Sequence, residues 1–137
     1  MFIADTTVII DTARGKDGVK KVLDQLHQED ICISSISLEE IYAGLGHSLS
    51  RLGVKTFTRI KEKYEKVLAQ FKPLAVTERL LKKAGMYRGE CLAKGFVVAP
   101  ADAIIAITAE MEGAGSIITR NPDHFKDAKV NILSYSI

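Results

Sequence analysis

Short apolar runs alternate along the chain with longer segments in which apolar positions recur every three or four residues. The short runs have the length and composition of buried strands, and they lie at 2–4, 31–34, 71–76, 116–119 and 130–133. The longer segments have helical periodicity, and they lie at 5–14, 17–29, 35–49, 54–70, 77–95 and 99–112. This alternation predicts an α/β fold, a three-layer α/β/α architecture with a mainly parallel, doubly wound sheet of four or five strands.

The segment 99–112 differs from the other predicted helices because it is apolar on nearly every side. Pro100 suits the first turn of a helix, since its fixed φ fits there and its missing N–H costs nothing. Asp102 lies in the same first turn, at the entrance to the core. Two interpretations are open: the carboxylate satisfies free N–H groups and the helix dipole, or it binds a cation.

Three other segments carry specific local expectations. The helix at 54–70 has an apolar stripe from Phe57 to Leu68 and a basic opposite face. Gly44 and Gly46 within the preceding helix indicate close packing or a bend. Pro73 cannot donate to a central ladder, so the run at 71–76 is expected at a sheet edge.

Composition bounds the class of protein. The 137 residues are expected to form one domain, 1–137, and the net charge of +2 does not demand a polyanionic partner. Cys32 and Cys91 show no zinc-binding spacing with each other or with histidine, so reduced thiols are expected. The sequence shows neither a signal peptide nor an apolar run long enough to span a membrane, so a cytoplasmic location without membrane association is expected.

Acidic residues follow several of the predicted strands. Asp5 directly follows the first, and the others are Glu40, Asp102 and Asp123. In a parallel sheet ligands bind outside the carboxyl ends of the strands, where these acids can converge. Clustered carboxylates must take up protons or bind a hard cation, so Mg²⁺ or Mn²⁺ is expected. Phosphate-binding, nucleophile-elbow and dinucleotide motifs do not occur, which excludes P-loop NTPases, α/β-hydrolases and Rossmann dehydrogenases.

Four sequence blocks together resemble a known family. The blocks are Asp5-Thr6-Thr7-Val8-Ile9, Ser37-Leu38-Glu39-Glu40-Ile41-Tyr42-Ala43-Gly44, Ala101-Asp102-Ala103-Ile104-Ile105-Ala106 and Thr119-Arg120-Asn121-Pro122-Asp123-His124-Phe125. In this order, each at a strand–helix junction, they resemble the PIN domain and specifically the VapC-type toxin ribonucleases of toxin–antitoxin pairs. The resemblance spans the whole chain.

The resemblance implies a Mg²⁺- or Mn²⁺-dependent endoribonuclease. Its catalytic and metal-binding residues would be Asp5, Glu40 and Asp102, with Asp123 as the fourth acid and Asn121 as the alternative fourth group. Glu39 and Glu40 point about 100° apart on a helix, so only one faces the site, and the motif register favours Glu40. RNA contacts are assigned to Thr6, Arg14, Thr119, Arg120 and Asn121, although the two threonines can also hydrogen-bond the acids. A homodimer and a protein antitoxin are the implied partners.

Two alternatives remain open from the residues alone. A haloacid-dehalogenase-like phosphatase would use Asp5 as nucleophile, but it needs a second acid two residues later, where Thr7 stands. The other alternative is a PIN-like fold that acts as a non-catalytic binding module.

Overall fold

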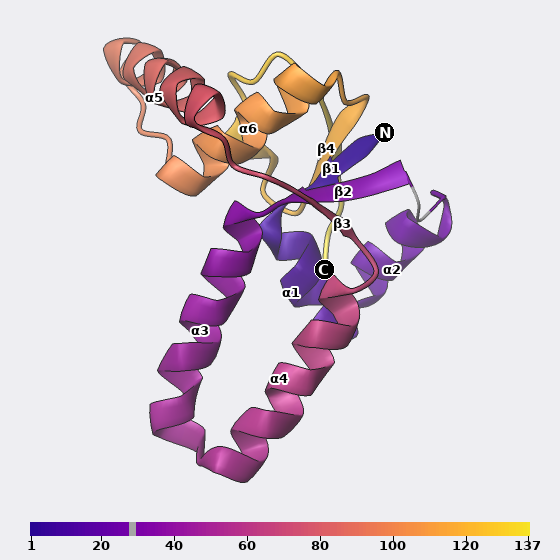
Figure 1. Ribbon diagram of the computed structural model, residues 1–137. Coiled ribbons are helices and arrows are strands. Elements are labelled where there is room, and N and C mark those ends of the chain that lie inside the picture. Colours follow the sequence, from indigo (N-terminus) through magenta and orange to yellow (C-terminus); the bar gives the residue numbers. More distant parts are fainter. Residues whose placement is uncertain (28–29) are drawn as a thin grey trace.

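The computed structural model describes residues 1–27 and 30–137 (Figure 1). Five strands, all paired in parallel, form one sheet with the order β3-β2-β1-β4-β5. The strands are β1 Phe2–Ala4, β2 Ile31–Ser34, β3 Lys72–Leu74, β4 Ser116–Thr119 and β5 Asn131–Ser134. All five predicted strands and the edge position of the Pro73 strand are therefore confirmed.

The helices alternate with these strands as the periodicity predicts. They are α1 Thr6–Ala13, α2 Asp17–Asp24, α3 Ile36–Leu52, α4 Val54–Leu68, α5 Glu78–Ala93, α6 Pro100–Glu112 and the 3-10 turn η2 Pro122–Phe125. The helix predicted at 17–29 ends earlier, at Asp24, and the last part of that prediction at 28–29 lies outside the described residues. The prediction of close packing at Gly44 and Gly46 is wrong, because a Cβ at either position would meet nothing within 4 Å.

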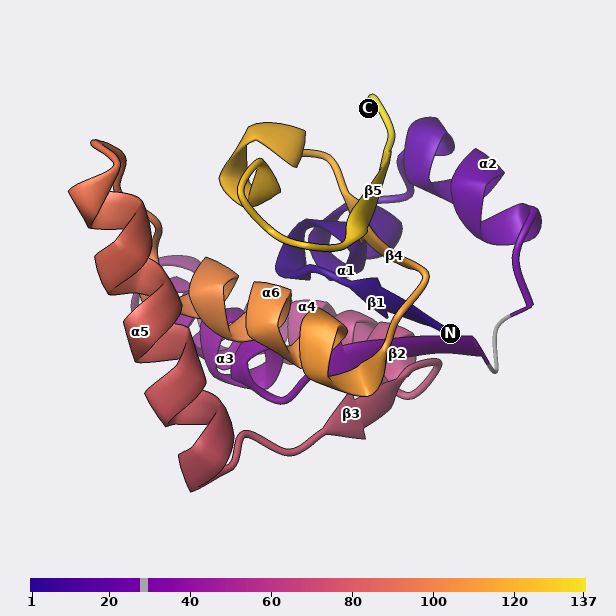
Figure 2. The same ribbon diagram turned by 90° about the horizontal axis from the view of Figure 1, so that it is seen from above.

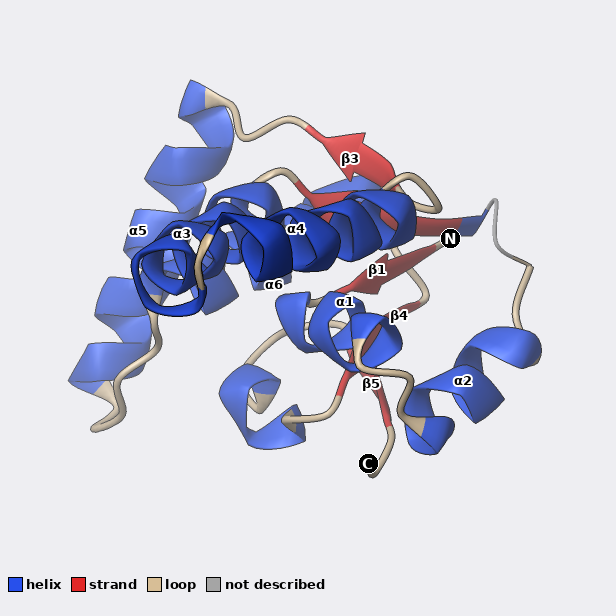
Figure 3. Cartoon of the chain, turned by 90° about the horizontal axis from the view of Figure 1, so that it is seen from below, coloured by secondary structure: helices blue, strands red, loops and turns tan. Residues whose placement is uncertain are grey.

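Helices cover both faces of the sheet, as a three-layer fold requires. Alternate residues of neighbouring strands point to opposite faces, so Ile3, Cys32 and Ile117 pack with α5 and α6. On the other face, Ile33 and Ile118 pack with α1 and the inner sides of α3 and α4. Figure 2 shows α5 beside α6 on the first face, and Figure 3 shows α1 and α4 in front of the strands on the second.

Helix α6 is the central element of the core on the face of the sheet that α5 and α6 cover. All residues from Ala103 to Ala109 are buried, which confirms a helix enclosed on every side. Its partner α5 is less enclosed, because Leu81 is half exposed. In the described part of the chain no helix is both long and apolar enough to cross a membrane.

The strand order reverses beside β1. The chain moves from β1 to β2 on one side and returns later to place β4 on the other side. Such a reversal opens a crevice at the carboxyl ends of the two strands, and this is where doubly wound sheets bind ligands. Asp5 follows β1 and Arg120 follows β4, so both lie at this point.

Candidate metal centre

Asp5 lies at the reversal of the sheet and is almost completely buried, with 3% of its surface exposed. It caps α1 by accepting a hydrogen bond from the Thr7 N–H at 3.1 Å. The Thr7 hydroxyl donates to the same oxygen, Oδ1, at 2.5 Å, and the Thr119 hydroxyl donates to Oδ2 at 2.6 Å. Burial raises the pKa of Asp5; these hydrogen bonds oppose the shift, and the nearby charge of Asp102 adds to it.

Both hydroxyls that bind Asp5 are themselves held by the backbone after β4. The Arg120 N–H donates to the Thr7 hydroxyl at 3.2 Å, and the Asn121 N–H donates to the Thr119 hydroxyl at 2.9 Å. Each hydroxyl that accepts from an N–H has its own proton free for one Asp5 oxygen. Two consecutive backbone amides therefore fix the orientation of the carboxylate through two threonines.

We expect Thr119→Val to weaken binding of a divalent cation by about 10–100-fold, the usual cost of losing a partner that orients a ligand. Valine keeps the shape of threonine but removes the donor that lowers the pKa of Asp5. Isothermal titration with Mn²⁺ measures the effect. Thr12→Val is the matched control, because the Thr12 hydroxyl bonds only its own helix, at Val8. Equal affinities of wild type and Thr119→Val would contradict this role.

Asp102 lies in the first turn of α6 and is half buried. Burial raises its pKa, and the interaction with His124 lowers it. Its Oδ2 lies 3.2 Å from Nδ1 of His124, whereas Oδ1 has no hydrogen-bond donor among the described residues. No side chain caps α6, since Ala99 precedes it. The negative charge of Asp102 also raises the pKa of Asp5, although less than burial does.

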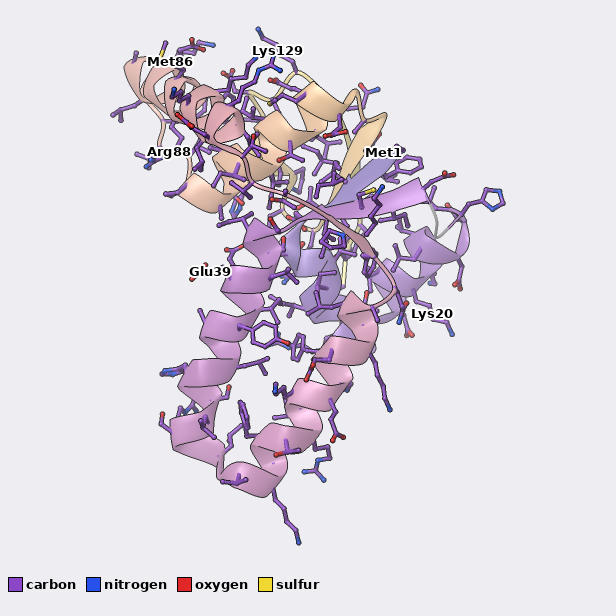
Figure 4. All side chains as sticks on the ribbon, viewed as in Figure 1. Met1, Lys20, Glu39, Met86, Arg88 and Lys129 are labelled. Carbon is purple, nitrogen blue, oxygen red and sulfur yellow. The ribbon has the colours of Figure 1, made fainter. Side chains whose placement is uncertain are left out.

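Glu40 reaches the same edge of the sheet from α3. Its Oε1 accepts a hydrogen bond of 2.5 Å from the Thr6 hydroxyl, which also lies 2.9 Å from the Ser37 hydroxyl. Glu39 lies on the outer side of α3 and points away from α1 (Figure 4). The structure therefore places Glu40 beside the start of α1, and Thr6 bonds an acid, one of its two expected roles.

The fourth block places a histidine, instead of an acid, against Asp102. His124 precedes the buried Phe125 and is the residue whose ring nitrogen contacts Asp102. Asp123 is exposed and lines a cavity of about 330 Å³ together with Asp102 and His124. The Asn121 N–H is used in the contact with Thr119. His124 is thus a site residue that the sequence reasoning missed, although its position just before the phenylalanine was the available signal.

The residues assigned to RNA contact differ in how far they are exposed. Thr119 is buried and its hydroxyl donates to Asp5, which is the other of its two expected roles. Arg120 forms an ion pair with Asp11, from Nε to Oδ2 at 2.8 Å, and 29% of its side chain is exposed. Arg14 is exposed and lines a separate cavity of about 410 Å³ between α1, α3 and α4, which Glu40 also lines.

The donor set at this edge suits a hard divalent cation. Among residues 1–27 and 30–137, no group of three or more His, Cys, Asp or Glu side chains is close enough to hold a metal by itself. Mg²⁺ is commonly held by one or two carboxylates, with waters and substrate phosphate completing the shell. Asp5 has a lone pair left on Oδ2, and Asp102 has Oδ1 free of described donors. The carboxylates of Asp5 and Asp102 therefore offer oxygen atoms of the kind that this binding mode uses.

Comparisons with known proteins agree with the fold. The family model described as "PIN domain" matches residues 2–131. A chain in the crystal structure of FitAcB from Neisseria gonorrhoeae is 28% identical, with a TM-score of 0.82 over 97% of this chain and 96% of that one.

Two further solved structures share the fold. VapBC2 from Rickettsia felis bound to a promoter DNA fragment contains a chain with 22% identity, a TM-score of 0.80 and coverage of 99% and 100%. A toxin–antitoxin complex from Klebsiella pneumoniae contains one with 21% identity, a TM-score of 0.76 and coverage of 100% of each chain. No curated protein matches the chain. Because the family model covers nearly the whole sequence, this chain belongs to the PIN domain family.

Proposed function

We propose that this protein is a Mg²⁺- or Mn²⁺-dependent endoribonuclease that hydrolyses RNA phosphodiester bonds and serves as the toxin of a toxin–antitoxin pair. Membership of the PIN family and the likeness to FitAcB support a nuclease. The observation that carries the metal dependence is geometric: the Asp5 carboxylate is buried and held at the reversal of the sheet with a lone pair left on Oδ2, and Oδ1 of Asp102 is free of described donors.

We propose a role for each residue of the candidate metal centre. Asp5 and Asp102 hold the cation, and Glu40 completes the acidic edge from α3. A bound Mg²⁺ or Mn²⁺ supplies positive charge to the phosphate and makes an attacking water more acidic. Thr7 and Thr119 keep both Asp5 oxygens in a fixed orientation, so little reorganisation is needed when the substrate binds. Asp123 and Asn121 remain proposed contributors from the fourth block.

The partners are likewise proposed from the resemblance to related PIN-domain proteins. The likeness to a chain in a toxin–antitoxin complex supports a protein antitoxin for this chain. A homodimer is proposed on the resemblance to toxin-like PIN domains. The phosphatase alternative has no specific support, because Thr7 replaces the second acid and its hydroxyl already donates to Asp5.

Incubation of the purified protein with a structured RNA tests the nuclease proposal. We expect cleavage with Mg²⁺ or Mn²⁺, no cleavage in EDTA, and recovery when the cation is added back. A DNA strand of the same sequence, run in parallel, tests the choice of RNA. Cleavage that persists in EDTA would contradict the proposed metal dependence, and an absence of cleavage under all conditions would favour a binding module.

A further inference from the structure

A second carboxylate, Asp11, is buried near the candidate metal centre and is not one of its proposed ligands. It lies in α1, two turns after the Asp5 cap, with 1% of its surface exposed. Its Oδ2 accepts two hydrogen bonds, from Arg120 Nε at 2.8 Å and from the Tyr135 hydroxyl at 2.7 Å. Its Oδ1 is buried and has no hydrogen-bond partner in the described part of the chain.

This arrangement is not one that stability alone would favour. A buried acceptor without a donor loses its hydration without compensation, and a buried ion pair often contributes less than apolar packing would. Burial and the hydrogen bond to Asp11 raise the pKa of the Tyr135 hydroxyl, so it remains a donor at neutral pH. Asp11 therefore holds two donors on one oxygen while its other oxygen remains unsatisfied.

Arg120 is the partly exposed member of this cluster. It contacts Asp11 through Nε, it also interacts with the Tyr135 hydroxyl, and 29% of its side chain is exposed. Its backbone N–H donates to Thr7, which in turn donates to Asp5, so the residue belongs to the edge that carries the acids. A guanidinium held at Nε keeps a planar fork of donors, which matches the geometry of a phosphate group.

The last residues of the sequence complete the cluster. Tyr135 follows β5, is buried, and donates its backbone N–H to the Thr119 carbonyl at 3.3 Å. The next residue, Ser136, lies directly against Gly18 of α2, where a Cβ would overlap the Ser136 carbonyl oxygen. Glycine at position 18 therefore allows the carboxyl-terminal segment to reach the position from which Tyr135 bonds Asp11.

We propose that Asp11 and Tyr135 are positioning residues that hold the Arg120 guanidinium for a backbone phosphate of the RNA. This inference rests on the proposed function, and it makes the carboxyl-terminal segment part of the substrate-binding edge. The ion pair fixes a cation against Asp11 of α1, whereas an unrestrained arginine would sample many rotamers.

Binding of a fluorescein-labelled single-stranded oligoribonucleotide, measured by anisotropy in EDTA, tests the proposal without cleavage. Removing a negative charge should tighten RNA binding if Asp11 acts only through its charge. Positioning predicts the opposite: about fivefold weaker binding by Asp11→Asn, and a salt dependence shallower by roughly 0.7, the value for one lost single-strand phosphate contact. Arg120→Gln should show the same loss, and the double variant should be no weaker than Arg120→Gln.

Further variants keep the test decisive. Tyr135→Phe removes one donor and should weaken binding about twofold, and Gly18→Ala should do the same by displacing Ser136. Asp127→Asn is the matched control, because it breaks an exposed pair with Lys94 elsewhere on the fold. Thermal melting identifies any variant that does not fold. If Asp11→Asn does not fold, Tyr135→Phe and Gly18→Ala decide whether the positioning role holds.

The outcomes separate the two proposals. Unchanged or tighter binding by Asp11→Asn, or unchanged binding by Arg120→Gln, overturns the positioning role and leaves the nuclease proposal intact. Wild-type protein that fails to bind RNA overturns the RNA substrate itself.

Discussion

Replacing Asp5 with asparagine is expected to remove RNA cleavage and, at the same time, to stabilise the protein in the absence of metal. Loss of a residue that merely orients a metal ligand costs about 10–100-fold, so loss of a proposed ligand should cost at least about 100-fold in rate. The stabilisation follows from burial, which raises the pKa of Asp5 and so shows that the charged form is disfavoured in the fold.

The asparagine retains the helix cap. Its side-chain oxygen can accept from the Thr7 N–H and hydroxyl, and its amide can face Thr119. We expect a gain of about 0.5–2 kcal/mol in the free energy of unfolding without metal, in the range usual for relieving a strained functional site. Cleavage assays and chemical denaturation in EDTA measure the two effects. Asp17→Asn, at the exposed start of α2, is the control for loss of one acidic charge.

The two results have different meanings if they disagree. An Asp5→Asn variant that cleaves RNA at the wild-type rate would remove Asp5 from the catalytic machinery. A variant that is inactive but also less stable would show that the carboxylate contributes hydrogen bonds that an amide cannot replace.

Added Mg²⁺ or Mn²⁺ is expected to raise the melting temperature, and to raise it more as the pH increases. At a cation concentration of 100 times Kd the stabilisation is about 2.7 kcal/mol. For a domain of this size that corresponds to roughly 8–10 °C. The pH dependence arises because the carboxylates must lose their protons before they bind the ion.

The metal-free protein should show the opposite trend with pH. Burial raises the pKa values of Asp5 and Asp102 above the 3.8 that is usual for an aspartate, so the folded state binds more protons than the unfolded state. Stability then falls as the pH rises from about 3.8 through the raised pKa values, and it does not fall further above them. Melting curves between pH 4 and pH 8, with EDTA or with Mn²⁺, measure both trends. A cation-induced shift that is independent of pH would argue against carboxylate ligands.

Much of the fold is predictable because each element has its own local signal. Five apolar runs bounded by breakers give the strands, and Pro100 and Gly113 mark the two ends of the buried helix α6. Asp5 and Asp102 can be proposed as site residues from the sequence because they stand at strand and helix boundaries, where a parallel sheet binds ligands.

The remaining contacts have no signal within one segment. Asp11 and Tyr135 lie 124 positions apart and meet only because β5 is placed beside β4. The use of Thr7 and Thr119 as relays depends on the direction of two hydroxyl protons, which is set by the backbone after β4. His124 was missed for a related reason: a short 3-10 turn decides whether position 123 or 124 faces Asp102.

The close contact between Gly18 and Ser136 has a practical consequence for anyone who handles the protein. A purification tag attached after Ile137 would begin two residues from the buried Tyr135 and would crowd the surface of α2. The turn between α3 and α4 offers a safer attachment point, since Gly53 and Val54 are exposed. Figure 1 shows this turn at the end of the two helices that is farthest from the sheet. A label placed there leaves the contact between Ser136 and Gly18 undisturbed.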